Sequence, residues 1–428
     1  MYLIISKKIF FVVFLTIIFN VDALERPEMI LWKEDLSFYH EQLESQHLNL
    51  YHSIKAKSFA QSLRNIENQL PDLTRTQVII ELMRLTRKVK DGHTTIPLWE
   101  QNFHFYPFEL FNFDGELRVI SSTPALKNIL GAKLIAIDDK DIDSVLQKVS
   151  EIAAFVDNHY SEIDRAAQYL RVAELLHGLG VTQNNRVSTF TFSVESGSTN
   201  QKNTMNTLTI EIQALAYSQR WSALTESLKD HSPVNRPPQS LFLSHTETLW
   251  YNLLKSKNVM YIRFDQFPNA SRMQKFSQEV LQVIQDNEVS RLIIDFRNNY
   301  GGDLYVGLIL AHQLNLADSI HWHDSVYVMI GRKTFSAAMN NAALYQKLLN
   351  ARLVGEPTGG APTGYQDMGQ FKLPNSGLVI TYSKRFFRLS DDKSSMIKPD
   401  ILIAPDWRFT KMGRDHVLEW VLEDKGQK

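Results

Sequence analysis

The spacing of apolar residues divides the chain into three stretches. From about residue 28 to 90, apolar side chains recur every three or four positions, which predicts helices with one buried face. The clearest series is Val78, Ile79, Leu82, Leu85 and Val89. From about 103 to 215 the pattern changes to short alternating or β-branched runs, which predict strands, interrupted by a helix at 161–176. The clearest predicted strands are 117–120, 133–137 and 188–192.

Beyond residue 240 the pattern alternates between buried strands and helices. Strands are expected at 259–264, 292–296 and 326–330, and helices at 271–285 and 304–314. This alternation predicts a parallel or mixed sheet with helices on its faces. In such sheets the active site tends to lie at the carboxyl ends of the strands, so the segments that follow these strands are of most interest.

The order of the elements predicts an α/β (α+β) chain that begins with a signal peptide, residues 1–23. Lys7 and Lys8 precede an apolar run that is too short to cross a bilayer as a helix, and small residues allow cleavage after Ala23. An uncleaved N-terminal anchor is the alternative. After the signal peptide we expect an N-terminal helical region at 24–100, a middle β-rich region at 101–235 and a C-terminal mixed-sheet domain at 236–428, with a proline-rich linker at 232–238.

Composition and charge exclude several classes of protein. The 428 residues include 46 basic and 47 acidic side chains, so a nucleic-acid partner, which usually needs a basic surface, is not expected. No cysteine is present, which excludes disulfides, thiolate metal sites and a cysteine nucleophile. Apolar residues make up 44% of the chain, as in ordinary globular proteins. We expect neither a cofactor nor a stable membrane anchor after signal cleavage.

Ser336 is the first candidate for a nucleophile. It follows the predicted strand 326–330 through a tight turn and opens an alanine-rich helix. A hydroxyl at that position lies at the positive end of the helix dipole, beside backbone N–H groups without intrahelical partners. These conditions favour both an alkoxide and an oxyanion. The alternative is that Ser336 or Thr334 only caps the helix, as Ser and Thr often do.

Two adjacent glycines, Gly301 and Gly302, follow the predicted strand 292–296. Such a pair lets the backbone approach a ligand closely with its N–H groups exposed. Together with the Ala337 amide, one of them would complete an oxyanion hole. Taken alone, a Gly-Gly pair after a strand is more often only a turn.

Thirteen histidines could supply a general base or metal ligands. His93 is the best placed base, because Asp91-Gly92 ends a predicted helix and leaves His93 on a loop, where catalytic groups are commonly held. His321-Trp322-His323 could suggest a metal site, but no third ligand with fitting spacing accompanies it. An exposed alternating strand is the expectation there, and no metal site is predicted.

Taken together, these segments resemble the tail-specific, or C-terminal processing, serine peptidase family, which also contains the tricorn core protease and the interphotoreceptor retinoid-binding proteins. The segments occur in the family's order and cover most of residues 250–405. They are Asp91-Gly92-His93-Thr94, Leu292-Ile293-Ile294-Asp295-Phe296-Arg297-Asn298-Asn299-Tyr300-Gly301-Gly302, Thr334-Phe335-Ser336-Ala337-Ala338, Val354-Gly355-Glu356-Pro357-Thr358-Gly359-Gly360, Leu373-Pro374-Asn375-Ser376-Gly377 and Ile397-Lys398-Pro399-Asp400-Ile401.

The resemblance implies a role for each candidate residue. Ser336 would be the nucleophile, and the Ala337 amide with Gly301 or Gly302 would form the oxyanion hole. The C-terminal domain would be a catalytic domain of the ClpP/crotonase-like type. The middle region would hold a PDZ-like module, which is best matched at 131–142.

One departure from the family decides which base is expected. The processing peptidases use a Ser/Lys dyad, and this chain has Ala361 where that lysine would align. The tricorn-type branch uses a histidine from the N-terminal region instead, and His93 matches its position. In that branch an acidic group near the C-terminal Pro-Asp motif orients the imidazole, which points to Asp392 or its neighbour Asp391. Lys333 is a rival base, but we expect it to be solvated on its turn.

The function that follows is that of an exported serine peptidase, periplasmic or secreted, acting on unfolded or short polypeptides by Ser/His/acid chemistry. Two alternatives remain open. One is a non-catalytic protein that binds an apolar ligand on the same fold, and the other is an esterase. If the His93 imidazole were more than about 6 Å from the Ser336 hydroxyl, with no hinge to close the gap, the base would have to be abandoned.

Overall fold

The computed structural model describes residues 24–195, 205–227, 247–390 and 394–424. The signal peptide at 1–23 and the linker at 232–238 lie outside these ranges and stay predictions. Within them, helices and several sheets are mixed along the chain, which confirms the α/β (α+β) class. None of the helices in these ranges is both long enough and apolar enough to span a bilayer.

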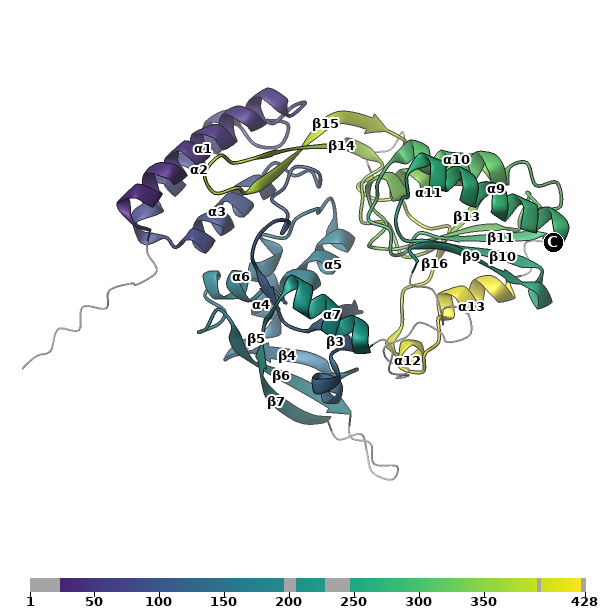
Figure 1. Ribbon diagram of the computed structural model, residues 1–428, viewed down its shortest axis with the longest axis horizontal. Coiled ribbons are helices and arrows are strands. Elements are labelled where there is room, and N and C mark those ends of the chain that lie inside the picture. Colours follow the sequence, from purple (N-terminus) through teal and green to yellow (C-terminus); the bar gives the residue numbers. More distant parts are fainter. Residues whose placement is uncertain (1–23, 196–204, 228–246, 391–393, 425–428) are drawn as a thin grey trace, which may run out of the picture.

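Three helices form the N-terminal region, where Figure 1 shows them packed together. They are α1 (Arg26–Gln46), α2 (Ala56–Gln69) and α3 (Arg75–Arg87), with a single 3-10 turn at Leu70–Asp72. The apolar positions that predicted them are buried. A reciprocal cap between Thr74 and Gln77 starts α3. Because α3 ends at Arg87, the segment that carries Asp91 and His93 leaves it as a loop.

The middle region is built on an antiparallel sheet in the order β2-β3-β4-β6-β7. Its strands are β2 (Phe108–Phe113), β3 (Glu116–Ser122), β4 (Lys133–Ile137), β6 (Val187–Glu195) and β7 (Met205–Gln213), and the short β5 (Lys140–Asp141) pairs with β4. The region's other elements are the pair β1 (His104–Phe105) and β8 (Leu215–Ala216), a 3-10 turn (Pro124–Ile129), and helices α4 (Ile142–Ser150), α5 (His159–Tyr169), α6 (Ala173–Gly178) and α7 (Tyr217–Ser227).

The three strands predicted in this region are confirmed, and the helix predicted at 161–176 is two helices, α5 and α6. The N-terminal helices and the middle region share one hydrophobic core, so residue 100 marks a change of secondary structure inside a common core. The PDZ-like character of the middle region stays a prediction.

A six-stranded sheet forms the centre of the C-terminal domain, in the order β16-β13-β12-β11-β10-β9, with only β9 antiparallel. Its strands are β9 (Leu249–Leu254), β10 (Val259–Phe264), β11 (Arg291–Asp295), β12 (Val326–Ile330), β13 (Arg352–Gly355) and β16 (Ile401–Leu402). The predicted strands and helices of this domain are confirmed within one or two residues.

Helices cover both faces of this sheet (Figure 1). The face with α9 (Ala270–Asp286), α10 (Leu304–Leu314) and α11 (Ser336–Leu348) encloses the larger core, and α13 (His416–Glu423) packs on the other face, preceded by the short α12 (Trp407–Thr410). The strands β10 to β13 are almost wholly buried on both sides, as parallel strands between two helix layers should be.

A long hairpin, β14 (Thr363–Lys372) and β15 (Val379–Arg388), leaves the C-terminal domain and reaches the N-terminal helices (Figure 1). Its tip joins their hydrophobic core through Leu373, Leu378 and Ile380. Thr381 forms a bridge with Thr95, eight residues after the end of α3. The hairpin therefore ties the segment that contains His93 to the domain that contains Ser336.

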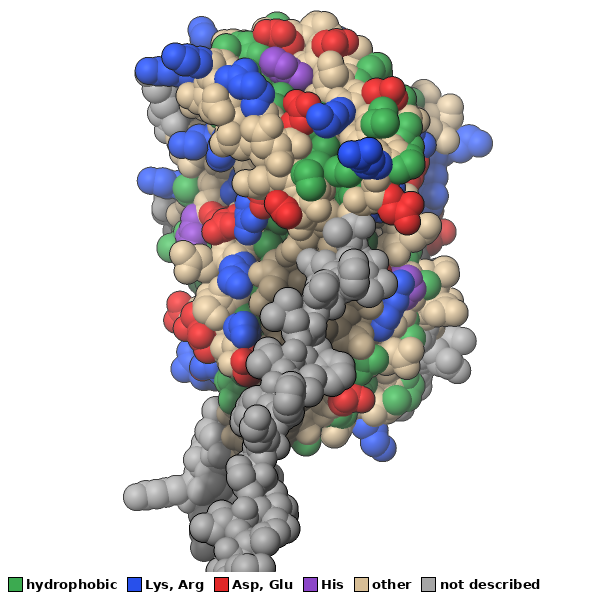
Figure 2. All heavy atoms as spheres, turned by 90° about the vertical axis from the view of Figure 1, so that its left-hand side faces the viewer, with side chains coloured by type: hydrophobic (Ala, Val, Ile, Leu, Met, Phe, Trp, Pro, Cys, Tyr) green, Lys and Arg blue, Asp and Glu red, His purple; other side chains and the backbone are tan. Residues whose placement is uncertain are grey.

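The expectation of a strand at His321-Trp322-His323 is wrong. These residues form a turn between α10 and β12, where His321 O accepts from Ser325 N at 3.0 Å. On the face of the molecule shown in Figure 2, basic and acidic side chains are interspersed, so that face carries no continuous basic surface.

Candidate active site

The turn after β12 places Ser336 at the start of α11. Thr334 Oγ1 donates to Phe296 O and accepts from Gly331 N, both at 2.9 Å, which fixes the turn against the neighbouring loop. Phe335 is the N-cap and makes no side-chain cap, so neither hydroxyl caps the helix as the alternative proposed. Ser336 has a φ of +50°, a left-handed conformation that is strained for a residue with a side chain. Such strain is concentrated at functional positions.

His93 lies directly against this serine. Its Nε2 is 2.9 Å from Ser336 Oγ, well within the limit of about 6 Å stated above. The buried imidazole stacks on Phe335 with ring centroids 5.2 Å apart. Its main chain is held from both sides, because His93 N donates to Asp91 Oδ1 at 3.2 Å and Thr381 Oγ1 donates to His93 O at 2.7 Å. His93 is thus held in place by the loop after α3 and by the hairpin.

The other ring nitrogen of His93, Nδ1, has no hydrogen-bond partner among the described residues. When Nε2 accepts the serine's proton, Nδ1 must carry the ring hydrogen. Burial lowers the pKa of His93 to about 4, and the charges of Asp91 and Asp367 oppose this only in part. At neutral pH the ring is therefore neutral, as a general base must be. The predicted orienting acids, Asp392 and Asp391, lie outside the described ranges.

Gly301 approaches Ser336 from the loop after β11. A Cβ atom on Gly301 would lie 2.7 Å from Ser336 Cβ, and its φ is +111°, so a side chain is excluded. The same Cβ would lie 3.2 Å from Ala337 N, which is in the first turn of α11 and has no intrahelical acceptor. Gly301 N donates to Asn299 Oδ1 at 2.8 Å. Of the two glycines, Gly302 therefore has the N–H that is free within the described chain.

A carboxylate occupies the place beside Ala361, where the processing peptidases carry a lysine. Asp157 Oδ2 accepts from Ala361 N at 3.1 Å, and Asp157 Oδ1 accepts from Gly92 N at 2.6 Å. A Cβ on Gly92 would lie 2.6 Å from that oxygen, so only glycine fits the contact. Burial raises the pKa of Asp157 to about 7, although both N–H donors oppose the shift. Asp157 joins the loop of His93 to the turn after β13.

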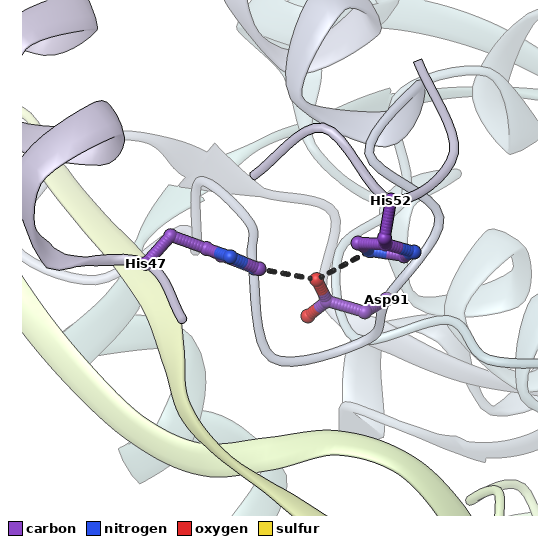
Figure 3. A group of neighbouring side chains, drawn as sticks. All are labelled: His47, His52 and Asp91. Atoms are coloured by element: carbon purple, nitrogen blue, oxygen red, sulfur yellow. Dashed lines mark hydrogen bonds and ion pairs between the residues drawn. The ribbon is translucent and has the colours of Figure 1, made fainter. Parts of the chain in front are cut away.

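Behind His93 lies a cluster of two histidines and an aspartate, drawn in Figure 3. His47 Nε2 donates to Asp91 Oδ2 at 3.0 Å, and His47 Nδ1 accepts from Asn49 N at 2.9 Å. His52 Nε2 lies 3.5 Å from the same carboxylate oxygen, which is too long for a good hydrogen bond. Burial opposes ionisation of Asp91, but hydrogen bonds from His47 and from Ser383 Oγ outweigh it and hold the pKa of Asp91 well below its usual range.

The three ligand atoms of this cluster lie within 4.8 Å of one another, a spacing that could hold a metal ion. The hydrogen bond from Asn49 argues against that use. Because His47 Nδ1 is the acceptor, the ring hydrogen is on Nε2, the atom that would have to bind the metal. Histidines that bind metals usually donate their other N–H to an acceptor, and here that nitrogen faces a donor. The cluster is therefore better described as a hydrogen-bonded support for Asp91.

Lys333 is half-buried, so the expectation that it is solvated is wrong. The nearby Tyr300 hydroxyl raises the pKa of Lys333, burial lowers it, and Asp164 and Glu109 raise it further. The net shift is upward, so Lys333 stays protonated at neutral pH and cannot accept the proton of Ser336.

Sequence reasoning missed Asp157 and His47, and it used Asp91 only as the end of a helix and as the first residue of the Asp91-Gly92-His93-Thr94 motif. Asp91 has a signal in the sequence, since it lies two residues before His93 in a short polar motif. Asp157 and His47 have none, because their partners are distant in the chain and become visible only after folding.

Comparison with known proteins identifies a family and a fold that this chain resembles. Residues 311–403, which include Ser336 and the hairpin, match the model of peptidase family S41. A crystal structure of a point mutant of CPAF matches with a TM-score of 0.62 at 13% identity, over 93% of this chain and 99% of that one. Mature CPAF complexed with lactacystin matches with a TM-score of 0.61 at 13% identity, over 92% and 97%.

A third match is the photosystem II D1 C-terminal processing protease, with a TM-score of 0.42 at 15% identity over 92% of this chain and 96% of that one. A TM-score below 0.5 does not establish a shared fold. At 13% identity, the CPAF structures show a shared fold and nothing about function. The family match covers the residues around Ser336 directly. Together, the match at 311–403 and the CPAF fold confirm the resemblance to the S41 serine peptidases that the motifs indicated, and the enzyme class that follows is serine-type peptidase.

Proposed function

We propose that this protein hydrolyses peptide bonds through an acyl-enzyme formed on Ser336, with His93 as the general base. The observation that carries the proposal is the 2.9 Å contact between His93 Nε2 and Ser336 Oγ. Two residues 243 positions apart meet at hydrogen-bond distance, at the start of a helix and with the imidazole neutral. This combination is what nucleophilic activation requires.

Each step of the proposed reaction is assigned to a named group. His93 Nε2 removes the hydroxyl proton as Ser336 Oγ attacks the scissile carbonyl, and the same nitrogen then protonates the leaving amine. Ala337 N and Gly302 N donate to the oxyanion, because neither N–H has another acceptor in the described chain. A water molecule, activated by the same imidazole, hydrolyses the acyl-enzyme.

The orienting acid is Asp392 in this proposal, with Asp391 as its neighbour and rival. Two features support the assignment of an acid from this segment. His93 Nδ1 is buried and lacks a partner among the described residues, and the free hydrogen it carries during catalysis needs an acceptor. The resemblance to the tricorn-type branch supplies the position.

The substrate class is a polypeptide, as for other S41 peptidases, and the site of action is outside the cytoplasm, periplasmic or secreted. The N-terminal residues Lys7 and Lys8, the apolar run after them and the small residues before Leu24 support export. A mature N-terminus at Leu24 in protein recovered from the producing cells would support this, and retention of residue 1 would contradict it.

The proposal is tested by labelling the purified protein with a fluorophosphonate probe and by measuring turnover of a fluorogenic peptide. We expect labelling and turnover in the wild type and neither in Ser336→Ala. Labelling without peptide turnover, combined with turnover of an ester substrate, would replace the peptidase with an esterase. Absence of labelling in a correctly folded wild type would refute both enzymes and favour the binding protein.

A further inference from the structure

Arg165, on α5, is a buried cation beside the active site. The residue is only 7% exposed, and its Nε is buried and has no hydrogen-bond partner within the described chain. Its ion pair is with Asp164 Oδ2, 3.7 Å from Nη1 and beyond hydrogen-bond length. A buried N–H without an acceptor costs free energy, so an acceptor supplied from outside the chain would bind favourably at Arg165 Nε.

Asp164 offsets the charge of this cation but makes no hydrogen bond to it, because the nearer carboxylate oxygen, Oδ2, already has other donors. Asp164 Oδ2 accepts from Gln168 Nε2 at 2.7 Å and from Tyr300 OH at 3.1 Å. The oxygen of Asp164 that lies nearest to Arg165 therefore already accepts two hydrogen bonds.

Aromatic rings surround the guanidinium instead of acceptors. Arg165 Cζ is 4.0 Å from the centroid of Tyr300, 5.7 Å from that of Phe155 and 5.9 Å from that of Phe335. Ring faces attract a cation, but they leave the N–H groups at the edge of the guanidinium plane without acceptors. Those groups can still bind a planar anion in the forked geometry that arginine favours.

The same rings place Arg165 next to the reacting atoms. Tyr300 immediately precedes Gly301, and Phe335 immediately precedes Ser336 and stacks on His93 at 5.2 Å. Arg165 is thus separated by one side chain from the oxyanion turn and by one side chain from the base.

Lys333 adds a second cation to this corner. It lies three residues before Ser336, it is half-buried, and it makes no hydrogen bond or ion pair within the described chain. Its raised pKa, caused first by the nearby Tyr300 and then by Asp164 and Glu109 against burial, keeps it protonated. Glu109 is itself paired with Arg171 and Arg220, so it is not available to either cation.

We propose that Arg165 and Lys333 form a subsite that binds a carboxylate of the polypeptide substrate next to the scissile bond. This inference rests on the proposed function and adds a substrate preference to it. The carboxylate has two possible sources, the side chain of a glutamate or aspartate within the chain and the carboxyl group at the chain end. Either would supply the in-plane acceptor that Arg165 lacks.

The first experiment needs only the wild-type protein. Matched fluorogenic peptides carry Glu or Gln at each position flanking the cleaved bond, with the chain end as acid or as amide. We expect kcat/KM to be about 10- to 100-fold higher for one carboxylate-bearing peptide than for its amide counterpart, as for a charge-assisted hydrogen bond. A Glu effect that persists in amidated peptides identifies a side-chain carboxylate. An effect restricted to the free chain end identifies the terminal one. Equal values throughout would overturn the proposal.

The second experiment assigns the preference to these two residues. In Arg165→Met and in Lys333→Met the carboxylate-to-amide ratio of kcat/KM should fall towards one, while Arg272→Met should keep the wild-type ratio. Arg272 is a suitable control because it is an exposed arginine on α9, paired with Glu247. A ratio unchanged in both variants would overturn the assignment.

A thermal melt checks that each variant is folded, and if Arg165→Met does not fold, Lys333→Met and the wild-type series decide. Failure of the proposed function gives a different result, because the wild type would then turn over none of the peptides and would not be labelled at Ser336.

Discussion

Asp91→Asn is the substitution from which the structure allows the most to be worked out. The Asp91 carboxylate accepts from His47 on one oxygen and from His93 N, Thr94 N and Ser383 Oγ on the other. The amide of asparagine keeps one acceptor oxygen for the three donors on that side, but its NH2 group then faces His47 Nε2. His47 cannot change tautomer without losing the bond from the backbone N–H of residue 49. Two donors then face each other in a buried place.

The expected loss of stability follows from these contacts. A hydrogen bond to a charged acceptor contributes about 1.5–3 kcal/mol, and a stranded buried donor costs about 1–3 kcal/mol more. We expect Asp91→Asn to lower the free energy of unfolding by about 3–5 kcal/mol in urea denaturation at pH 7. Ser383→Ala is the matched control, because it removes one donor and keeps the charge, and a loss of about 1.5–3 kcal/mol is expected for it, without the further cost of a stranded donor.

The pH dependence gives the sign of the effect. The folded protein holds the pKa of Asp91 below its unfolded value of about 4, so the carboxylate stabilises the fold above that pH and the contribution is lost as the pH falls further. The difference in the free energy of unfolding between the wild type and Asp91→Asn should therefore become smaller below about pH 4. In the double variant with His47→Ala the facing donors are gone, and part of the loss should return. An Asp91→Asn protein with wild-type stability and turnover would refute this account.

Three further predictions concern the site. His93→Gln should lower kcat/KM for peptides by roughly 100- to 10,000-fold with an unchanged melting temperature, and a smaller loss would argue for another base. Gly301→Ala should abolish labelling of Ser336, because its Cβ would lie 2.7 Å from the serine Cβ, whereas Gly115→Ala, with φ +86° and open space around it, should keep activity. Burial raises the pKa of Asp157 to about 7, so wild-type stability should fall between about pH 4 and 7 as this carboxyl ionises, and Asp157→Asn should remove that slope in denaturation measured across the range.

The sequence predicts elements well where burial is uniform and partners are local. The strands 133–137 and 326–330 have the predicted bounds, because continuous apolar runs flanked by turns leave little choice of register. The strand at 321–323 was wrong because alternation over three residues is too short to separate a strand from a turn.

The contact between His93 and Ser336 could be expected only through the resemblance. No spacing rule joins residues 243 positions apart. The hairpin β14–β15 helps to bring them together, and its sequence does not indicate which part of the chain it packs against. Arg165 was missed for the same reason, since an arginine on a helix gives no sign of the three rings that surround it.

Under the proposed function, Ala361 and Asp157 together account for a histidine base in a chain that lacks the lysine of the processing peptidases. The turn after β13 carries the base in the processing peptidases, and here Ala361 N is held by Asp157, which also holds Gly92. The turn has become part of the support for the loop that presents His93. Asn158 extends the support, because its Nδ2 donates to Ser395 O at 2.7 Å, close in sequence to the predicted orienting acid.

The acid limb of the pH–rate profile tests that acid. Burial, opposed in part by the charges of Asp91 and Asp367, lowers the pKa of His93 to about 4, and a carboxylate at Nδ1 would raise it by stabilising the imidazolium. The profile of kcat/KM reports the free enzyme and that of kcat the substrate complex. If Asp392 reaches the ring only when substrate is bound, the acid limb of kcat should lie at a higher pH than that of kcat/KM. In Asp392→Asn the two limbs should coincide near pH 4. The account would be refuted if the acid limbs of kcat and kcat/KM coincided at about pH 6.5 in the wild type and did not move in Asp392→Asn. Asp392 would then not orient the imidazole, and His93 would be less buried during turnover than in this structure.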